Sequence, residues 1–301
     1  MSEELESDTG RDAGEPARGT RLSALEIHQN IRQPAEEELE RPFSALLFSA
    51  LAAGMLIAFS FLAGAYAASL TDDPVLKKAV EAAAYPLGFI FVVIGRSELF
   101  TENTLEPVIP LLHRRDLKTL LGMLRLWGVL LLGNLVGALV MALVLSRTQM
   151  VDESLRESLA HVSEAATSDG FALTLYRGVF AGWLIALLAW LLASTRETIA
   201  HIALIWLCTA PINAFHFRHS IAGAVEAFYR ADTGGAAWGD MLGSFVVPSI
   251  IGNAIGGVVL VALMNYGQVA EEHANKKKGG GSGDGGNREK QPTRGEAVRR
   301  L

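Results

Sequence analysis

The stretch "NAFHFRHSIAG", residues Asn213 to Gly223, places two histidines and an arginine where Leu, Val and Ala are expected. The apolar run before it, Thr198 to Phe215, contains Pro211, and a second apolar piece, Ser220 to Phe228, follows it. A hydrocarbon core about 30 Å thick needs about 20 apolar helical residues. The two pieces together are long enough to cross once, so we predict a broken membrane span.

A second run of the same kind lies earlier in the chain. Ala82 to Gly95 is uncharged but too short to cross a bilayer, and Pro86 interrupts it. A partly apolar piece, Leu99 to Leu112, continues it. Ionisable residues follow the first piece, namely Arg96, Glu98, Glu102 and Glu106. We predict a second broken span here.

Four further runs are ordinary candidates for transmembrane helices: three are long and free of charge, and the fourth is slightly short unless it is extended past one arginine. They are Phe43 to Leu70, Leu126 to Ser146, Gly178 to Thr195 extended backwards past Arg177 by Phe171 to Tyr176, and Met241 to Ala270. Charged residues crowd the chain ends and short loops instead of helix faces, as expected for a membrane protein. The sequence therefore predicts an all-α polytopic membrane protein with six transmembrane helices in residues 42–270, of which the second and fifth are broken.

The two broken spans are the middle members of two sets of three. Because a set of three spans ends on the opposite side of the membrane, the second set is inserted upside down. Matching interruptions in two inverted three-helix repeats indicate a transport site near the bilayer midplane. Irregular backbone survives there only where protein or a water-filled cavity surrounds it. The alternative is a pair of kinks in a purely structural bundle.

Lysine and arginine near the span ends predict the orientation of the chain. The richer side is expected to be cytoplasmic and to hold both termini, which suits a bacterial inner membrane. The connection 147–170 is then outside. The richer side carries Arg41, Arg114, Arg115, Lys118, Arg125, Arg196 and Lys276 to Lys278, and the other side carries Lys77, Lys78, Arg147, Arg156 and Arg230.

The terminal segments differ from the membrane domain in composition. Residues 1–41 are polar and acidic without an apolar core near Met1, so we expect a cytoplasmic tail and no secretory signal peptide. Within this tail, residues 21–33 are expected to form a helix on the inner membrane surface or in solvent. Residues 271–301 are rich in Gly and charge, and we expect a disordered cytoplasmic tail. A single cysteine, Cys208, rules out an internal disulfide, and nothing points to nucleic acid.

Three short motifs resemble those of the formate/nitrite transporter family, over about Arg41 to Gly267. "SELFTENTL" (Ser97 to Leu105) resembles the broken second helix of that family, and "FRHSIAG" (Phe217 to Gly223) its signature at the broken fifth helix. "GNAIGG" (Gly252 to Gly257) resembles the glycine-rich sixth helix. The long N-terminus and the "FTEN" variant are most similar to the YfdC-like branch of the family.

The resemblance implies an aquaporin-like helical bundle that assembles as a homopentamer with a pore inside each protomer. Its substrates would be small monovalent anions such as formate, nitrite, hydrosulfide or lactate, moved with protons through the lipid bilayer without a cofactor. Small-residue runs such as "LAAG" (Leu51 to Gly54) and "GNAIGG" would allow the close helix approach that assembly needs. The implied substrate pathway comprises the central histidine His219, Thr101 of the second-helix loop, the constrictions Tyr85, Phe89 and Ile212, and Arg218 and Asn253.

The chain departs from the family pattern at two places. The family usually carries a lysine before the fourth helix, and the matching place here is near Ala166. The residue before the histidine is commonly acidic, and here it is Arg218. Arg218 could supply the missing positive charge unless Glu98 or Glu102 neutralises it; Arg177 and Arg96 are further candidates for attracting an anion.

The chemistry of the residues supports such a pathway. A bare anion in an apolar pore is costly, and a weak acid with a pKa near 4 is almost fully ionised at neutral pH. Histidine exchanges a proton near neutral pH, so His219 could protonate or polarise the anion. Tyr85 and Phe89 are four residues apart and therefore lie on one face of a helix. Their rings would either exclude water from the pathway or only pack against neighbouring helices. The pair of histidines in "HFRH" lacks the further ligands of a metal site, so we expect none.

Two other functions remain open on the sequence. One is a non-conducting membrane scaffold or sensor whose tails bind partners. The other is an intramembrane enzyme that uses His219 and Glu226 as acid and base, although no nucleophile motif accompanies them.

Overall fold

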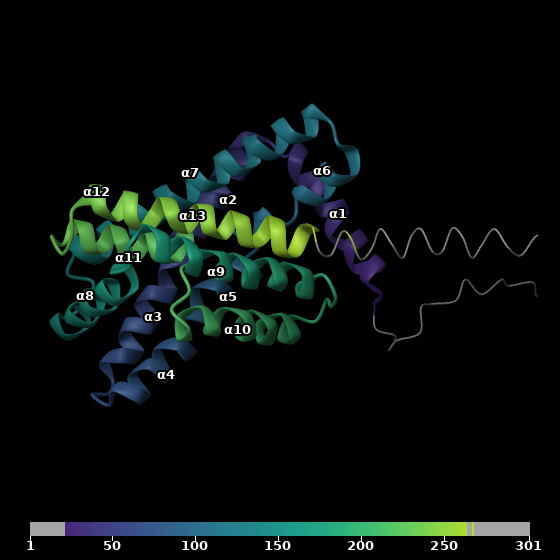
Figure 1. Cartoon of the computed structure of the whole chain (residues 1–301). Helices are drawn as coiled ribbons and strands as arrows, with labels where there is room; N and C mark the ends of the chain where they lie inside the picture. The colour runs from purple at the N-terminus through teal and green to yellow at the C-terminus, as the bar shows by residue number, and fades with distance from the viewer. Residues whose placement is uncertain (1–21, 264–266, 268–301) are drawn as a thin grey trace, which may run out of the picture.

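The computed structural model describes residues 22–263 and 267, and every regular element in these residues is a helix (Figure 1). Four helical stretches are long and apolar enough to cross a membrane: Phe43–Ser69, Leu117–Arg147, Phe171–Leu192 and Trp238–Val259. They coincide with the four uninterrupted runs of the sequence, which confirms an all-α polytopic membrane protein.

These four stretches contain the following elements. The first consists of α2 (Phe43–Leu56) and α3 (Ala58–Ser69), and the second and third are α7 (Leu117–Arg147) and α9 (Phe171–Leu192). The last consists of α12 (Trp238–Asp240), the π-helix η2 (Met241–Val246), α13 (Val247–Ile255) and the π-helix η3 (Gly256–Leu263). Its expected continuation to residue 270 lies mostly outside the described residues.

The two predicted interruptions are present. The first set of pieces is α4 (Pro74–Ala84), α5 (Pro86–Ile94), the 3-10 helix η1 (Glu102–Thr104) and α6 (Val108–Arg114). The second set is α10 (Thr198–Ala214) and α11 (Ser220–Asp232). Residues 95–101 and 215–219 form the two breaks.

Some helices extend beyond the charge-free runs. The helix α4 begins at Pro74, where the Asp73 carboxylate caps it, so Lys77 and Lys78 lie inside a helix. The helix α7 begins at Leu117 instead of Leu126, because Asp116 caps it. A search for uncharged runs misses such amphipathic first turns, since capping rather than hydrophobicity starts them.

The connection 147–170 contains a helix that the sequence reading did not predict. The helix α8 (Glu153–Thr167) starts at the capping residue Asp152 and buries Leu159 and Val162. It packs on α3 and α11. In Figure 1, α8 and α12 lie at the left, while α1 (Ala24–Glu40) and α6 lie at the right, and we call these the α8 end and the α1 end.

The helix α1 is docked on the bundle. It is longer than expected, includes Pro34, and buries His28, Ile31 and Ala35. Ile31 packs in a small apolar cluster with residues of α6, α7 and α9. Residues 1–21 and the expected C-terminal tail at 271–301 lie outside the described residues.

Small residues allow the helices to approach closely within the chain. A Cβ atom at Gly54 would collide with the backbone of Asn134, and one at Gly182 with the backbone of Asn253. The pairs α2–α7 and α9–α13 are accordingly tightly packed. The runs "LAAG" and "GNAIGG" therefore serve contacts within one protomer, and they carry no argument for assembly.

Candidate functional site: a histidine between two broken helices

The two breaks share one backbone geometry. Arg96 and His216 adopt left-handed conformations, with φ of 53° and 56°. The next amides, of Ser97 and Phe217, donate to carbonyl oxygens five residues back, at 3.0 and 2.8 Å. This pattern ends a helix and turns the chain sharply away from its axis. Both α5 and α10 therefore end with the same C-terminal capping motif.

An asparagine from the sixth span holds the break that follows α10. The Oδ1 atom of Asn253 accepts from the amide of Ser220 at 2.8 Å. Its Nδ2 atom donates to the carbonyls of Gly178 at 2.9 Å and Arg218 at 2.8 Å. Asn253 thereby satisfies backbone groups that the break leaves without helical partners.

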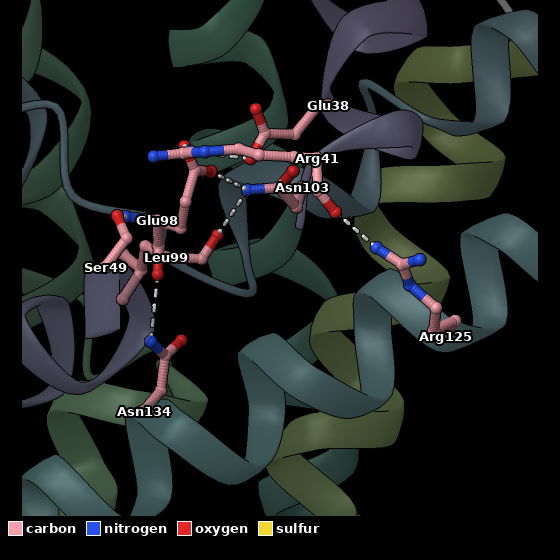
Figure 2. A network of polar contacts seen from close by, with 8 residues as sticks. All are labelled: Glu38, Arg41, Ser49, Glu98, Leu99, Asn103, Arg125 and Asn134. Carbon is pink, nitrogen blue, oxygen red and sulfur yellow. Dashed lines mark hydrogen bonds and ion pairs between the residues drawn. The ribbon is translucent and has the colours of Figure 1, made fainter. Parts of the chain in front are cut away.

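An asparagine from the third span does the same for the first break. The Oδ1 atom of Asn134 accepts from the amide of Phe100 at 2.8 Å. Its Nδ2 atom donates to the Ala50 carbonyl at 2.8 Å and to the Glu98 carbonyl at 2.9 Å, and Figure 2 shows the second of these bonds. The sequence reading missed Asn134. The signal was present, since "GNLVG" at 133–137 and "GNAIG" at 252–256 share the same spacing of Gly and Asn.

His219 lies at the point where the two breaks meet. Its Nε2 atom lies 2.8 Å from the Thr101 hydroxyl, which belongs to the other break. Its Nδ1 atom accepts a hydrogen bond from the amide of Ala222 at 3.1 Å, and the side chain caps α11. A backbone amide only donates, so the lone pair is on Nδ1 and the proton on Nε2. His219 thus presents one N–H, which donates to Thr101.

Aromatic rings surround this pair. The Phe89 ring meets the imidazole of His219 edge to face, with centroids 4.9 Å apart. The Tyr85 ring lies 5.4 Å from that of Phe89. Thr101 and Phe89 are fully buried, and His219 and Tyr85 are nearly so. The structure therefore brings together four of the residues that the resemblance placed on the pathway. Ile212 is also fully buried, and its carbonyl takes part in the second break.

A cavity of about 320 Å³ leads from the α8 end to His219. Tyr85, Arg218 and His219 line it, as do His161, Ala165 and Ala166 of α8. Lys77, Lys78 and Glu81 of α4 and Glu226 of α11 also line it. Ala166, the place of the missing lysine, thus faces the same cavity as the two lysines of α4. We refer to this space as the α8-end cavity.

Arg218 is paired with an aspartate that the sequence reading missed. Its guanidinium lies 2.6 Å from the Asp169 carboxylate, and the two side chains are 6% and 11% exposed. Arg177 binds the same oxygen of Asp169 at 2.6 Å. The carboxylate that neutralises Arg218 is therefore that of Asp169, and not that of Glu98 or Glu102, the two possibilities that the sequence left open. Asp169 follows α8 in a turn, and only the unpredicted position of α8 brings it to Arg218.

Glu98 belongs to a separate network at the α1 end (Figure 2). Its carboxylate lies 3.0 Å from the Arg41 guanidinium and accepts from Asn103 Nδ2 at 2.9 Å. Arg41 also binds Glu38 at 2.8 Å, and Arg125 donates to the Arg41 carbonyl at 2.5 Å. The network ties α1 and α7 to the first break.

The other sequence candidates are placed as follows. The Arg96 side chain is exposed and forms no ion pair with the part of the chain that the structure describes. In the same residues, no group of three or more His, Cys, Asp or Glu is arranged to hold a metal ion. Cys208 is buried and free.

Comparison with known proteins identifies the family. Residues 25–267 match the family model described as formate/nitrite transporter. The inner membrane protein YfdC of Escherichia coli (strain K12) is 34% identical over 256 residues, which cover 85% of this chain and 82% of that protein. A probable formate transporter of Methanothermobacter thermautotrophicus is 28% identical over 246 residues, covering 71% of this chain and 88% of that protein.

A solved structure has the same fold. A pentameric formate channel with formate bound has a TM-score of 0.62 at 22% identity, covering 74% of this chain and 96% of that one. The family model that matches is that of a transporter, so the alternative of an enzyme with His219 and Glu226 is wrong. With its apolar spanning helices, the chain is an integral membrane protein that belongs to the formate/nitrite transporter family.

Proposed function

We propose that the chain is a channel or proton-coupled transporter for small monovalent anions of the formate, nitrite, hydrosulfide and lactate class. The observation that carries this proposal is the N–H of His219, buried between two broken helices and reached from the α8-end cavity. The named relatives, a probable formate transporter and a formate channel, support the substrate class.

His219 acts on the anion as a polarising donor. An anion that leaves water must exchange its hydration for other hydrogen bonds, because a buried unpaired charge costs many kcal/mol. The Nε2–H of His219 is one donor, and the Thr101 hydroxyl becomes a second when it turns from the imidazole. Tyr85 and Phe89 on one side and Ile212 on the other form the apolar narrowings that exclude hydrated ions.

The helix α4 supplies the positive charge that draws anions into the cavity. Arg218 and Arg177 share the carboxylate of Asp169, which screens both. Lys77 and Lys78 line the cavity, and the described residues provide no salt-bridge partner for them. Because exposed charges at the mouth of a cleft raise the local concentration of counter-ions, these lysines replace the one absent near Ala166.

The assembly and topology follow the family relatives. The chain forms a homopentamer with a pore in each protomer, and the pentameric state of the formate channel with the same fold supports this assembly. Two inverted three-helix repeats account for the matching bonds of Asn134 and Asn253. The α1 end faces the cytoplasm, and an inner-membrane relative supports that membrane as the location.

Uptake into proteoliposomes tests the proposal. Purified protein is reconstituted, and the uptake of formate, nitrite, hydrosulfide, lactate and acetate is compared with that of empty vesicles. We expect at least one anion to enter at least tenfold faster with protein present. If none does, the chain is a non-conducting scaffold or sensor, which is the remaining alternative.

A further inference from the structure

A carboxyl group without a partner faces the α8-end cavity. Glu226 is 6% exposed and lines the cavity, yet it forms no hydrogen bond or ion pair with any residue that the structure describes. The other carboxyls nearby are engaged. Glu81 accepts from Asn213 Nδ2 at 2.9 Å, and Asp169 binds two arginines. Glu226 is thus free to interact with whatever enters the cavity.

Glu226 lies on the same face of α11 as His219. His219 caps the start of α11 and Glu226 lies seven positions further along, which corresponds to about 10 Å along the axis at 1.5 Å per residue. Gly223 lies between them and also lines the cavity. A Cβ atom there would collide with the Phe245 ring, and it would lie 3.8 Å from Glu226 Oε2. The absence of a side chain at Gly223 makes room for the Phe245 ring, and the carboxyl and the imidazole both face the same cavity.

His219 is poorly placed to release a proton. Its single proton, on Nε2, cannot leave without forming an imidazolate. A second proton would have to reside on Nδ1, where the amide of Ala222 already points. The position at the start of α11 also disfavours a positive charge on the ring. A proton that travels with the anion therefore needs another source.

We propose that Glu226 is the group that gives a proton to the substrate anion in the α8-end cavity and takes it back on return. This inference rests on the proposed function. An O–H bond of the Glu226 carboxyl breaks as an O–H bond forms on the anion, leaving a neutral acid and a carboxylate. A proton from the solution, relayed by water in the cavity, then returns to the carboxylate. A cavity volume of about 320 Å³ is large enough for several waters.

The order of events follows from the placement. The anion is neutralised beside Glu226, and the neutral acid then passes Tyr85 and reaches His219, whose N–H therefore polarises the acid instead of the bare anion. An unpaired carboxylate at Glu226 is costly, so the group does not stay ionised without a proton donor nearby. Because its ionised form is costly, a buried carboxyl holds its proton until an acceptor arrives, and it can then act as a general acid.

Several charged or titratable groups face Glu226. Lys77, Lys78, Glu81 and Tyr85 come from α4 and the turn after it, and His161 comes from α8. Arg218 and His219 come from the break before α11, and His216 lies at the same cavity. The neighbouring helices α3 and η2 bring only Ala68 and Phe245 to the lining. Asp72 lies at the rim before α4.

The experiment measures proton and formate uptake together. Proteoliposomes hold a pH-sensitive dye and receive labelled formate between about pH 5 and 8. Four proteins are compared: the wild type, Glu226→Gln, Glu226→Asp and the control Glu164→Gln. Glu164 is a suitable control because its side chain is 69% exposed and pairs with Arg230 outside the cavity.

We expect Glu226→Gln to lower formate uptake at pH 7 at least tenfold, and the uptake that remains should fall about tenfold per pH unit, as the concentration of formic acid does. Glu226→Asp should restore part of the rate, and Glu164→Gln should match the wild type. A wild-type rate and pH profile in Glu226→Gln would overturn the assignment. Wild-type protein that moves none of the five anions would instead contradict the transport proposal.

A second measurement decides if Glu226→Gln fails to fold. A carbodiimide reacts with a protonated carboxyl in an apolar site, and peptide mapping locates the product. Wild-type protein treated at pH 7 should be modified at Glu226 and lose formate-coupled proton uptake. No modification there, or modification without loss of uptake, would overturn the assignment.

Discussion

The position of His219 at the start of α11 determines what its imidazole can do. The backbone amide of Ala222 donates a hydrogen bond to the lone pair of Nδ1, so Nε2 carries the proton and faces Thr101. The ring is therefore a donor with one fixed direction. This favours a polarising role at the centre of the pathway over the exchange of protons.

Substitutions of His219 separate donation from proton exchange. The amide nitrogen of glutamine reaches about as far as Nε2, so His219→Gln should keep at least a tenth of the formate uptake and the wild-type pH profile. His219→Ala removes the donor, and we expect at least a tenfold loss, worth about 1.4 kcal/mol. Uptake by reconstituted protein across pH 5 to 8 checks both variants. Loss of the pH dependence in His219→Gln would show that the imidazole itself carries the proton.

The ion-pair group around Asp169 predicts a stability effect. Asp169→Asn leaves two arginines without their carboxylate, one of them almost fully buried. Removing one partner of a buried pair costs about 3–5 kcal/mol, so the melting temperature in detergent should fall by several degrees. Glu164→Gln breaks a pair whose carboxylate is exposed to solvent, worth at most about 1 kcal/mol. Equal melting temperatures for the two variants would mean that Asp169 is not structurally important.

At the residue level, the sequence picked out polar groups that the structure places together, and their role in transport stays a prediction. His219 and Thr101 stood out as polar groups beside interrupted apolar runs, and the structure brings them within hydrogen-bond distance. Asp169 did not stand out, because an acidic residue in a polar loop is ordinary. Its meaning depends on the fold of the connection before α9. The exposure of Glu226 to the cavity likewise depends on packing that no local pattern contains.

At the scale of elements, the two breaks are the distinctive feature. Each ends a helix with a left-handed residue, and each is held by an asparagine with three hydrogen bonds. The backbone at these places has no helical partners, and no water is available in a bilayer core to replace them. The asparagines make the irregular backbone tolerable there.

Replacement of either asparagine should have a similar effect. Asn134→Leu and Asn253→Leu each leave a buried amide and two carbonyls with fewer partners. Buried unsatisfied groups cost about 1–3 kcal/mol each, so each variant should lose at least about 3 kcal/mol of stability. Thermal unfolding in detergent measures this loss. Asn30→Ala, which removes one exposed bond to Ala193, is the control. A large loss in only one of the two variants would contradict equivalent roles.

If the two lysines of α4 attract the anion, the rate of formate uptake should depend on salt concentration. Lys77→Ala with Lys78→Ala should slow formate uptake several-fold at about 0.01 M salt, where the Debye length is about 30 Å. The effect should shrink at about 1 M salt, where that length is about 3 Å. Lys118→Ala, at the start of α7 and away from the cavity, is the control. A loss that salt does not change would point to a structural role for the pair.

Element prediction worked for uniform apolar runs and failed for amphipathic ones. Four spans are visible because a bilayer demands long uncharged helices. The first turns of α4 and α7 and all of α8 mix charge with apolar residues, so hydropathy alone does not reveal them. Their capping aspartates Asp73, Asp116 and Asp152 were the available signal.

At the scale of the whole molecule, each chain contains all the parts of the proposed pathway. The cavity, both breaks, Thr101 and His219 all belong to one protomer. A pentamer of such chains would have five separate pathways, and a central opening between protomers would not be needed for transport.

Mixed pentamers test this central claim most directly. Wild type and His219→Ala are co-expressed at known ratios, purified together and reconstituted, and formate uptake per protomer is measured. A pathway within each protomer predicts uptake that falls in direct proportion to the fraction of wild type. A single shared pore that needs all five histidines predicts uptake that falls with about the fifth power of the wild-type fraction. Either this result, or uptake that does not change with the wild-type fraction, would contradict the account.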